Sequence, residues 1–204
     1  MSRLKSLALL LAIPALACAQ FHRAEQDREI RYWLLEPESH QFKISHDFTI
    51  TRVGQQSAHS FVRKGSTVND DAQMYNLDTG EPLPTKNVSG KSVNALGYYP
   101  TPTEDDSVVV QGDLSKPVGE GETVRIRCIE SYTDAEGYFV RNGELVWSRT
   151  LGRPLNYVTL PAGWMLTSLN SPAIVTLDDQ SRVTLRFTNI RNDNLAVTIH
   201  AKKR

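Results

Sequence analysis

The chain has 204 residues with 23 basic and 23 acidic side chains, so its formal net charge is zero. Without a net positive charge, neither nucleic acid nor an anionic membrane surface is expected as a partner. Of the two cysteines, Cys18 lies in a candidate leader, and Cys128 alone remains if that leader is removed. A single thiol forms no internal disulfide, so a hydrophobic core has to stabilise the fold.

Residues 1–19 have the pattern of a secretory signal peptide. Arg3 and Lys5 precede an apolar run at 7–17, and Ala17-Cys18-Ala19 supplies the small residues of a cleavage site. The run is too short for a transmembrane helix, which needs roughly 20 residues. We therefore predict export to the periplasm or the extracellular space, with a mature chain that begins at Gln20. No transmembrane helix is expected.

Cys18 also permits an alternative in which the protein is lipid-anchored. Ala15-Leu16-Ala17-Cys18 resembles a bacterial lipobox, in which the lipidated cysteine becomes the first mature residue. The usual motif has leucine three positions before the cysteine, and this sequence has Ala15 there. We expect ordinary cleavage, and contact with a membrane only if Cys18 is lipidated.

After a polar connecting segment at 20–28, alternation of polar and apolar residues predicts strands. In the first half of the chain the expected strands are 29–35, 41–52, 61–68 and 73–77. Residues 36–39 and Asp78-Thr79-Gly80 are expected turns. Residues 99–107 contain two prolines and three consecutive acidic residues, which favours a linker or a long exposed loop.

The second half of the chain carries stronger strand signals. The expected strands are 124–128, 138–140, 145–147, 156–160, 165–169, 173–177, 182–188 and 195–202. Asn142-Gly143 lies between two apolar runs and predicts a tight hairpin, because both central positions of such a turn take positive φ. The polar residues 189–194 predict a second hairpin, between 182–188 and 195–202.

Many short strands, frequent turns and no long helix indicate an all-β protein with an antiparallel β-sandwich fold. Residues 107–204 alone offer about eight strands, which fits an immunoglobulin-like sandwich of about 100 residues. We therefore predict such a sandwich at 107–204. Residues 29–100 are expected to form either an N-terminal β layer on it or a separate subdomain.

The familiar catalytic motifs are absent. Asp78-Thr79-Gly80 matches the triplet of aspartic proteases, but it lacks their apolar flanks and a second carboxylate. Gly90-Lys91-Ser92 matches the end of a phosphate-binding loop, yet Thr85 stands where the first glycine belongs. The common serine hydrolase, zinc protease and dithiol motifs are not found. No catalytic residue, cofactor or metal ligand is therefore predicted.

Histidines and acidic runs do not form a recognisable metal site. His40 and His46 share one strand face, but six residues of strand place them about 20 Å apart. The acidic runs at 69–71 and 104–106 lack the spacing of a calcium loop. Cys128 is in phase with apolar neighbours and is expected in the core.

Aromatic residues in the expected loops are candidate ligand-binding residues. Tyr98, Tyr99 and Trp164 lie beside glycine and proline, and the loops at the ends of a sandwich are where binding surfaces occur. Exposed rings stack on sugars or anchor peptides. The alternative for Trp164 is burial as a plug at one end of the core.

A family resemblance rests on Tyr132-Thr133-Asp134, Leu145-Val146-Trp147, Asn156–Leu160 and Pro161-Ala162-Gly163-Trp164. These segments resemble extracytoplasmic immunoglobulin-like β-sandwich modules of exported bacterial proteins, including modules that precede metallopeptidase or transglutaminase-like domains. The resemblance covers roughly 122–204 and concerns turns and strands, not a catalytic motif. It implies a stand-alone accessory module, and it carries over no functional residue.

Together these observations predict a non-enzymatic exported β-sandwich that binds a protein or a glycan in the cell envelope. Binding would use end loops or an exposed sheet edge. Two alternatives remain: an envelope lipoprotein with a structural role, and a hydrolase with an unrecognised site near His40, His46 or the acidic loops. A deep polar pocket that holds several of those side chains would favour the hydrolase.

Overall fold

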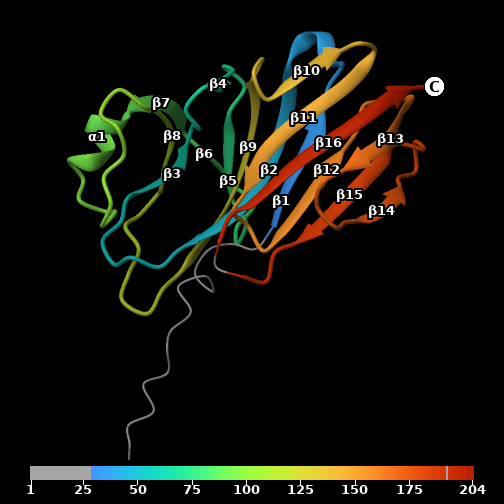
Figure 1. Cartoon of the computed structure of the whole chain (residues 1–204). Helices are drawn as coiled ribbons and strands as arrows, with labels where there is room; N and C mark the ends of the chain where they lie inside the picture. The colour runs from blue at the N-terminus through green and yellow to red at the C-terminus, as the bar shows by residue number, and fades with distance from the viewer. Residues whose placement is uncertain (1–28, 192) are drawn as a thin grey trace, which may run out of the picture.

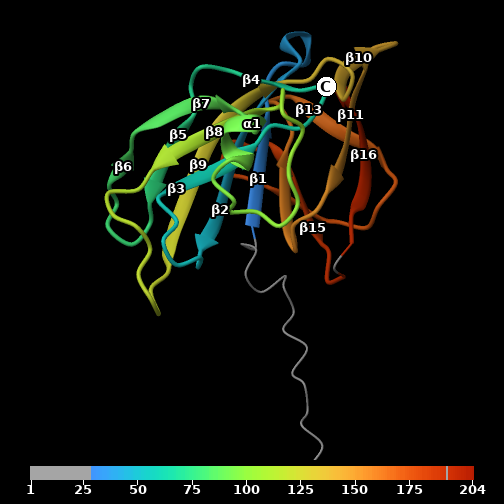
Figure 2. The ribbon, with the colours of Figure 1, turned by 90° about the vertical axis from the view of Figure 1, so that its left-hand side faces the viewer.

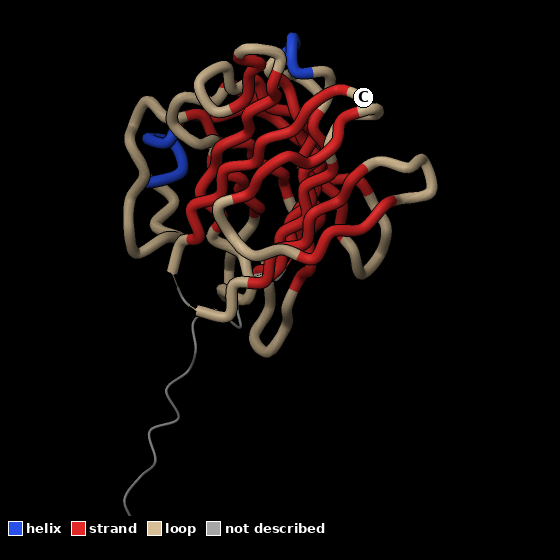
Figure 3. The backbone as a smooth tube through the Cα atoms, turned by 45° about the vertical axis from the view of Figure 1, so that its right-hand side comes forward, coloured by secondary structure: helices blue, strands red, loops and turns tan. Residues whose placement is uncertain are grey.

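The computed structural model describes residues 29–191 and 193–204. The described part is almost entirely β-structure, with 16 strands and two short helical segments, a 3-10 turn at Pro37–Ser39 and α1 at Gly90–Asn94 (Figure 3). The prediction of an all-β sandwich is confirmed. The expected leader at 1–19, with Cys18, and the connecting segment at 20–28 lie outside the described residues.

The largest sheet has nine strands in the order β14-β15-β12-β1-β2-β9-β5-β6, with β4 also paired to β9. Its members are β1 (Glu29–Leu34), β2 (Gln41–Ile50), β4 (Thr67–Val68), β5 (Gln73–Asn76), β6 (Pro82–Leu83), β9 (Val124–Thr133), β12 (Leu155–Thr159), β14 (Ile174–Leu177) and β15 (Val183–Thr188). Strands β1 and β12 run parallel, and the other pairs are antiparallel.

Two smaller sheets accompany it. The four-stranded sheet contains β10 (Tyr138–Arg141), β11 (Glu144–Leu151), β16 (Leu195–Lys203) and β13 (Trp164–Leu169). The three-stranded sheet contains β3 (Ser57–Phe61), β8 (Val108–Asp113) and β7 (Thr85–Ser89). In Figure 1 these two sheets lie on opposite sides of the molecule, with β2 and β9 between them, and Figure 2 shows the three-stranded sheet facing the viewer.

The inner face of the β2–β9 pair is defined by strict alternation. Phe42 pairs with Tyr132, Ile44 with Glu130, and His46 with Cys128, and all six side chains are buried. Paired residues of neighbouring strands lie on the same face of a sheet. One continuous face therefore carries aromatic residues at one end and polar residues next to them, with the apolar pairs Phe48–Ile126 and Ile50–Val124 beyond.

The four-stranded sheet seals the aromatic end of this face. Trp147 of β11 meets the Tyr32 ring edge-on at 5.3 Å between centroids and the Phe42 ring at 6.3 Å. The Tyr138 ring contacts Phe42 as well, at 6.5 Å. Such edge-to-face contacts add about 0.5–1.5 kcal/mol each to the effect of burial. This cluster is the dry centre of the sandwich.

The three-stranded sheet approaches the polar end of the same face. Gly112 of β8 permits a close approach, because a Cβ there would lie 2.7 Å from the Met74 sulfur on β5. Met74 is in turn the partner of Cys128 across β5 and β9. The polar end is thus covered by different strands from those that cover the aromatic end.

Of the two hairpins expected in the second half, one is confirmed. Asn142 and Gly143 have φ of 53° and 74°, and they join β10 to β11 with Arg141 paired to Glu144. The hairpin between β15 and β16 was a wrong prediction. Strand β15 pairs with β12 and β14, whereas β16 pairs with β11 and β13 in the other sheet. Both strands bury alternate apolar residues in the sandwich core, so the connection crosses between sheets.

The first half differs in detail from the expected strands. The segment expected as one strand at 61–68 contains only the last residue of β3 and the short β4, because Gly65 turns the chain with φ of 87°. Strands from 29–100 and from 107–204 pair within the same large sheet, as β1 does with β12 and β2 with β9. The two segments therefore do not form separate sheets.

Neither helix of the described residues is long and apolar enough to cross a membrane.

Candidate functional site

A cleft of about 720 Å³ opens where the two smaller sheets leave the β1–β2–β9 face uncovered. Its floor is formed by inner-face residues of β1, β2 and β9. One wall comes from β3 and the loop at Tyr98–Pro100, and the other from the end of β11 and the residues that follow. A volume of this size lies within the range of small-molecule sites, about 300–1,000 Å³.

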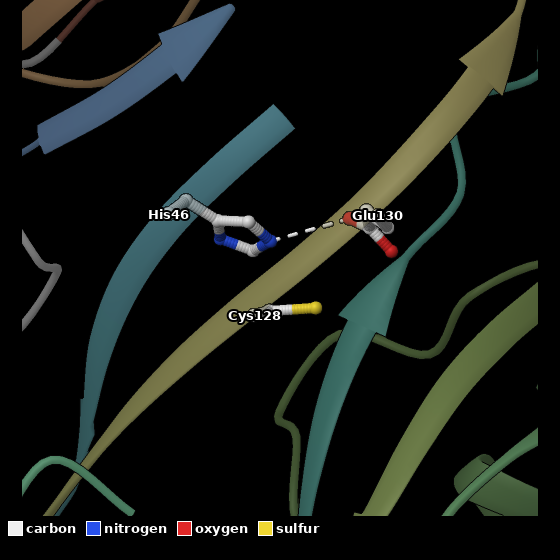
Figure 4. A group of neighbouring side chains, drawn as sticks. All are labelled: His46, Cys128 and Glu130. Carbon is white, nitrogen blue, oxygen red and sulfur yellow. Dashed lines mark hydrogen bonds and ion pairs between the residues drawn. The ribbon is translucent and has the colours of Figure 1, made fainter. Parts of the chain in front are cut away.

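Three side chains of different chemistry meet at or beneath the floor (Figure 4). His46 projects from β2, and Cys128 and Glu130 project from β9 on the same side of the sheet. One potential ligand atom from each lies within 4.8 Å of the other two, and all three residues are buried. Within residues 29–191 and 193–204 this is the one group of three or more histidine, cysteine and acidic side chains at such spacing.

Glu130 is the centre of a hydrogen-bond network. Its Oε1 accepts from the Ser60 hydroxyl at 2.8 Å and from the Tyr132 hydroxyl at 3.0 Å. His46 Nε2 lies 3.3 Å from the same oxygen. Burial by itself would raise the pKa of Glu130, but the contact with His46 and these hydrogen bonds outweigh it and hold the pKa below its usual value. Glu130 is therefore a buried carboxylate at neutral pH.

The neighbouring groups stay protonated. Burial, followed by the negative charge of Glu130, raises the pKa of the Cys128 thiol. The same two causes raise the pKa of the Tyr132 phenol. The phenol therefore stays protonated and donates a hydrogen bond to Glu130. Two buried polar atoms, Glu130 Oε2 and His46 Nδ1, have no hydrogen-bond partner among the described residues. A buried acceptor without a partner is costly, at about 1–3 kcal/mol.

Ser60, His46 and Glu130 contain the residue types of a hydrolytic triad, but not its geometry. The Ser60 oxygen lies 3.2 Å from His46 Nε2, which is within reach for proton transfer. In a triad the carboxylate holds the other imidazole nitrogen. Here Glu130 contacts the same imidazole nitrogen as Ser60 does. Glu130 also accepts a hydrogen bond directly from the Ser60 hydroxyl. The serine is therefore not set up as a nucleophile.

One wall of the cleft is positively charged. The described residues that line the cleft include four arginines and a single acidic residue, Glu130. Arg63, Arg149 and Arg153 form the charged wall, whereas Arg52 lies at the Tyr98 loop on the other side. Burial and then repulsion by Arg149 lower the pKa of the Arg63 guanidinium. Asp134 neutralises Arg149 through an ion pair of 3.1 Å.

The positive charges of three of these arginines act on Tyr32. Its pKa is raised by burial, and this effect is opposed by the charges of Arg149, Arg63 and Arg153. Arg63 also donates to the Thr150 carbonyl at 2.7 Å, which fixes it against the end of β11. The wall is therefore a preformed region of positive potential.

The opposite wall is aromatic. Tyr99 and Phe61 meet edge to face at 5.0 Å between ring centroids, and both rings are partly exposed, at 37% and 42%. The Tyr99 hydroxyl contacts His59 Nδ1 at 3.1 Å. Burial of this hydroxyl raises the pKa of Tyr99 to about 12. Arg52 donates to the Tyr98 carbonyl at 3.0 Å and so anchors the loop.

The structure brings together only some of the residues that the sequence singled out. Tyr98, Tyr99 and His46 line the cleft. Trp164 is buried, at 4% exposure, so its ring is closed to an external ligand. His40 lies after the 3-10 turn with φ of 56°, and its Nδ1 contacts the Tyr138 carbonyl at 2.7 Å, away from the cleft.

The other sequence candidates have local structural roles. Gly80 turns the chain with φ of 77°, and Asp78 pairs with Arg125. The run at 90–92 begins α1, which Ser89 caps, and no glycine-rich loop precedes it. Asp71 of the first acidic run bonds Ser131, and Glu104 of the second pairs with Lys64. The two runs do not line the cleft.

Sequence reasoning missed Glu130, Ser60 and the arginines. Glu130 has the inward phase of Ile126 and Cys128, so an acidic residue at an inward position of a strand was the available signal. Ser60 and His59 were not recognised because all of their strand, β3, except Phe61 lies between the expected strands 41–52 and 61–68. The arginines come from segments that are far apart in the chain.

No protein-family model matches the chain, and no curated protein matches it. Among solved structures, the chain is similar to an M1 zinc metallopeptidase from Deinococcus radiodurans, with 15% identity and a TM-score of 0.49 over 87% of this chain and 41% of that one. An aminopeptidase N family protein from Idiomarina loihiensis has 10% identity and a TM-score of 0.45 over 85% and 29%. This chain thus spans less than half the length of either protein. Neither likeness assigns an activity or a residue role here.

Proposed function

We propose that the protein is a non-enzymatic binding module of the cell envelope, and that its cleft holds an acidic glycan. The observation that carries the proposal is the cleft itself, which places partly exposed aromatic rings opposite a wall of arginines. The pattern of a secretory leader at 1–19 supports the location in the envelope.

The charge of the lining favours an anionic ligand. The positive charges of Arg149, Arg63 and Arg153 all act on Tyr32, and Arg149 has Asp134 as its ion-pair partner. Guanidinium groups bind carboxylates through paired hydrogen bonds. Uronic acids and other carboxylated sugars present such a group at the edge of a ring.

The aromatic wall favours a sugar ring as the body of the ligand. Phe61 and Tyr99 offer apolar faces, and the Tyr98 loop that holds Tyr99 is anchored by Arg52. A preformed wall loses little freedom when it binds a ligand. A peptide could also contact aromatic rings, but the combination of ring faces with guanidinium groups suits a carboxylated sugar better.

The hydrogen bonds of Ser60 support a binding role and not a hydrolytic one. The Ser60 hydroxyl donates its hydrogen bond to Glu130, and the described residues leave His46 Nδ1 without an orienting acceptor. Of the residues expected for a hydrolase site, His46 alone lines the cleft, whereas His40 and the acidic loops do not. The cleft is therefore assigned to binding.

Calorimetric titration with matched acidic and neutral oligosaccharides tests the proposal. We expect the acidic ligand to bind at least about tenfold more tightly, since tenfold corresponds to about 1.4 kcal/mol. Arg63→Ala should remove that preference. Tyr99→Ala should weaken both ligands about tenfold, whereas Tyr75→Ala, outside the cleft, should change neither. Equal affinity for the two ligands, no binding of either, or cleavage of the bound oligosaccharide would contradict the proposal.

A further inference from the structure

Three side chains at or beneath the floor of the cleft, His46, Cys128 and Glu130, together offer the ligand atoms of a metal site. An imidazole, a thiol and a carboxylate lie within 4.8 Å of one another on two neighbouring strands. The register places His46 directly opposite Cys128, and Glu130 follows two residues later on the same face. Nitrogen, sulfur and oxygen donors together are typical of Zn²⁺ and unlike the all-oxygen sites of Ca²⁺ or Mg²⁺.

Glu130 supplies an independent observation. The residue is 1% exposed, and its Oε2 has no hydrogen-bond partner in the described part of the chain. Among the described residues its ion-pair partner is His46, which is charged only when protonated. A buried carboxylate with an open oxygen is stabilised by a cation that occupies the open position.

From these observations we propose that His46, Cys128 and Glu130 bind one divalent transition-metal ion of the zinc type. The proposal is independent of whether the cleft binds a glycan. The ligand atoms around a tetrahedral Zn²⁺ are roughly 3.3–3.7 Å apart, from bond lengths of about 2.0–2.3 Å. Glu130 binds through its open Oε2 while Oε1 keeps its hydrogen bonds to Ser60 and Tyr132. One potential ligand atom of each side chain lies within 4.8 Å of the other two, so small side-chain adjustments bring the set to this spacing.

The balance of charge and protons is consistent with this site. Cys128 binds as a thiolate: its S–H bond breaks, the proton goes to solvent, and sulfur donates an electron pair to the ion. His46 and Glu130 donate lone pairs without losing a proton. One thiolate and one carboxylate then neutralise the two positive charges of the ion.

The surroundings of the three ligands provide outer support and access. Ser60 and Tyr132 both hold Glu130 in place, as the outer partners of metal-binding carboxylates do. His46 and Glu130 line the cleft, which gives an ion a path from solvent. A water molecule from the cleft completes the tetrahedron.

Cobalt titration of the chelator-treated protein tests the site directly. Co²⁺ bound to a thiolate gives a charge-transfer absorption in the near ultraviolet, and tetrahedral Co²⁺ gives intense visible bands. We expect both signals to saturate at one equivalent per chain and to disappear when Zn²⁺ displaces the cobalt. The absence of a thiolate band at saturation would overturn the proposal.

Variants locate the signal within the chain. In the full-length chain of 204 residues, Cys128→Ser should abolish the charge-transfer band, whereas Cys18→Ser, which changes the other cysteine, should keep it. Glu130→Gln should weaken zinc at least about 100-fold, because loss of an outer partner alone costs about 10- to 100-fold. Ser60→Ala, which removes such an outer partner, should weaken it about tenfold. His200→Gln, at the partly exposed pair with Glu144, should leave affinity unchanged.

Thermal unfolding with and without zinc gives a second test of the site, which is also usable for variants of lower stability. Zinc should raise the melting temperature of the unmodified chain, because an ion that binds only the folded state stabilises it. The same addition should not shift the melting temperature of Cys128→Ser. Equal shifts in both proteins, or a band that follows Cys18, would show that the ion binds elsewhere.

Discussion

The inner face of the β2–β9 pair has two regions that differ in chemistry although they share the same strands and register. At one end Phe42 and Tyr132 stack with centroids 6.1 Å apart, and Trp147 packs against Phe42. At the other end His46 and Cys128 lie opposite each other beside Glu130. Four residues along β2 separate a dry aromatic core from a buried polar cluster.

The difference arises from what covers each region. The four-stranded sheet covers the aromatic end with apolar side chains and with the guanidinium of Arg149, which lies 4.9 Å from the centre of the Phe42 ring. Strand β3 covers the polar end, and it brings the Ser60 hydroxyl to Glu130. The two coverings do not meet, and the cleft lies between them. A buried polar group is tolerated only where a partner reaches it, so β3 determines where the carboxylate can lie.

The largest expected effect is on the aromatic region. Trp147→Ala removes a side chain that is 1% exposed and contacts Tyr32 and Phe42. We expect the free energy of unfolding to fall by about 3–5 kcal/mol, through lost burial and the cavity that remains. Denaturant titration measures this change.

Phe139→Ala is the matched control, because Phe139 lies on the opposite face of the same sheet and contacts Arg141. Its loss should cost about 1 kcal/mol or less. A comparable loss in both variants would mean that the dry centre is not where the structure places it.

An intermediate effect is expected at the boundary between the two regions. Tyr132 stacks with Phe42 through its ring and donates to Glu130 through its hydroxyl. Tyr132→Phe keeps the ring and removes one of the donors to a buried carboxylate, which should cost about 1–2 kcal/mol. The same change at half-buried Tyr75 should cost less. Unfolding curves that coincide with those of the unmodified protein would show that the polar region does not depend on this donor.

The smallest effect is expected on the outer face of the same sheet, where Asp78 pairs with the guanidinium of Arg125 on β9. Because both side chains are exposed, Asp78→Asn should cost at most about 1 kcal/mol. Hydrogen bonds from the Arg125 backbone amide and then from its side chain lower the pKa of Asp78.

This direction of the pKa shift fixes how the Asp78 contribution depends on pH. A lowered pKa in the folded state gives a contribution that is present above the unfolded value of about 4 and is lost as the pH falls below it. The unfolding free energies of the unmodified protein and of Asp78→Asn, measured between neutral and acidic pH, give this contribution as their difference. A difference that grows on acidification would contradict the assignment.

Local signals in the sequence correctly predicted local structure. Asn142-Gly143 specified a hairpin because few residue pairs accept two positive φ angles. Alternation placed Cys128 inside, since period two determines which face a side chain takes. The same alternation could not identify the partners of β15 and β16, because it indicates a buried face and not a hydrogen-bonded neighbour.

The candidate site was only partly predictable for a similar reason. Tyr98 and Tyr99 were singled out as loop aromatics, and both line the cleft. Glu130 lies 84 residues from His46 and 70 from Ser60, so no spacing motif links them. Trp164 had the same loop signal as the tyrosines, but the core encloses it.

The sequence by itself determined the class of the fold, the tight turns and which side chains face inward, because backbone sterics and strand alternation act over a few residues. Only the tertiary structure decided which inward residues meet. His46, Cys128 and Glu130 come together through the register of β2 on β9, and the cleft exists because two separate sheets cover one face incompletely. Those outcomes depend on long-range packing, which no short segment of the chain encodes.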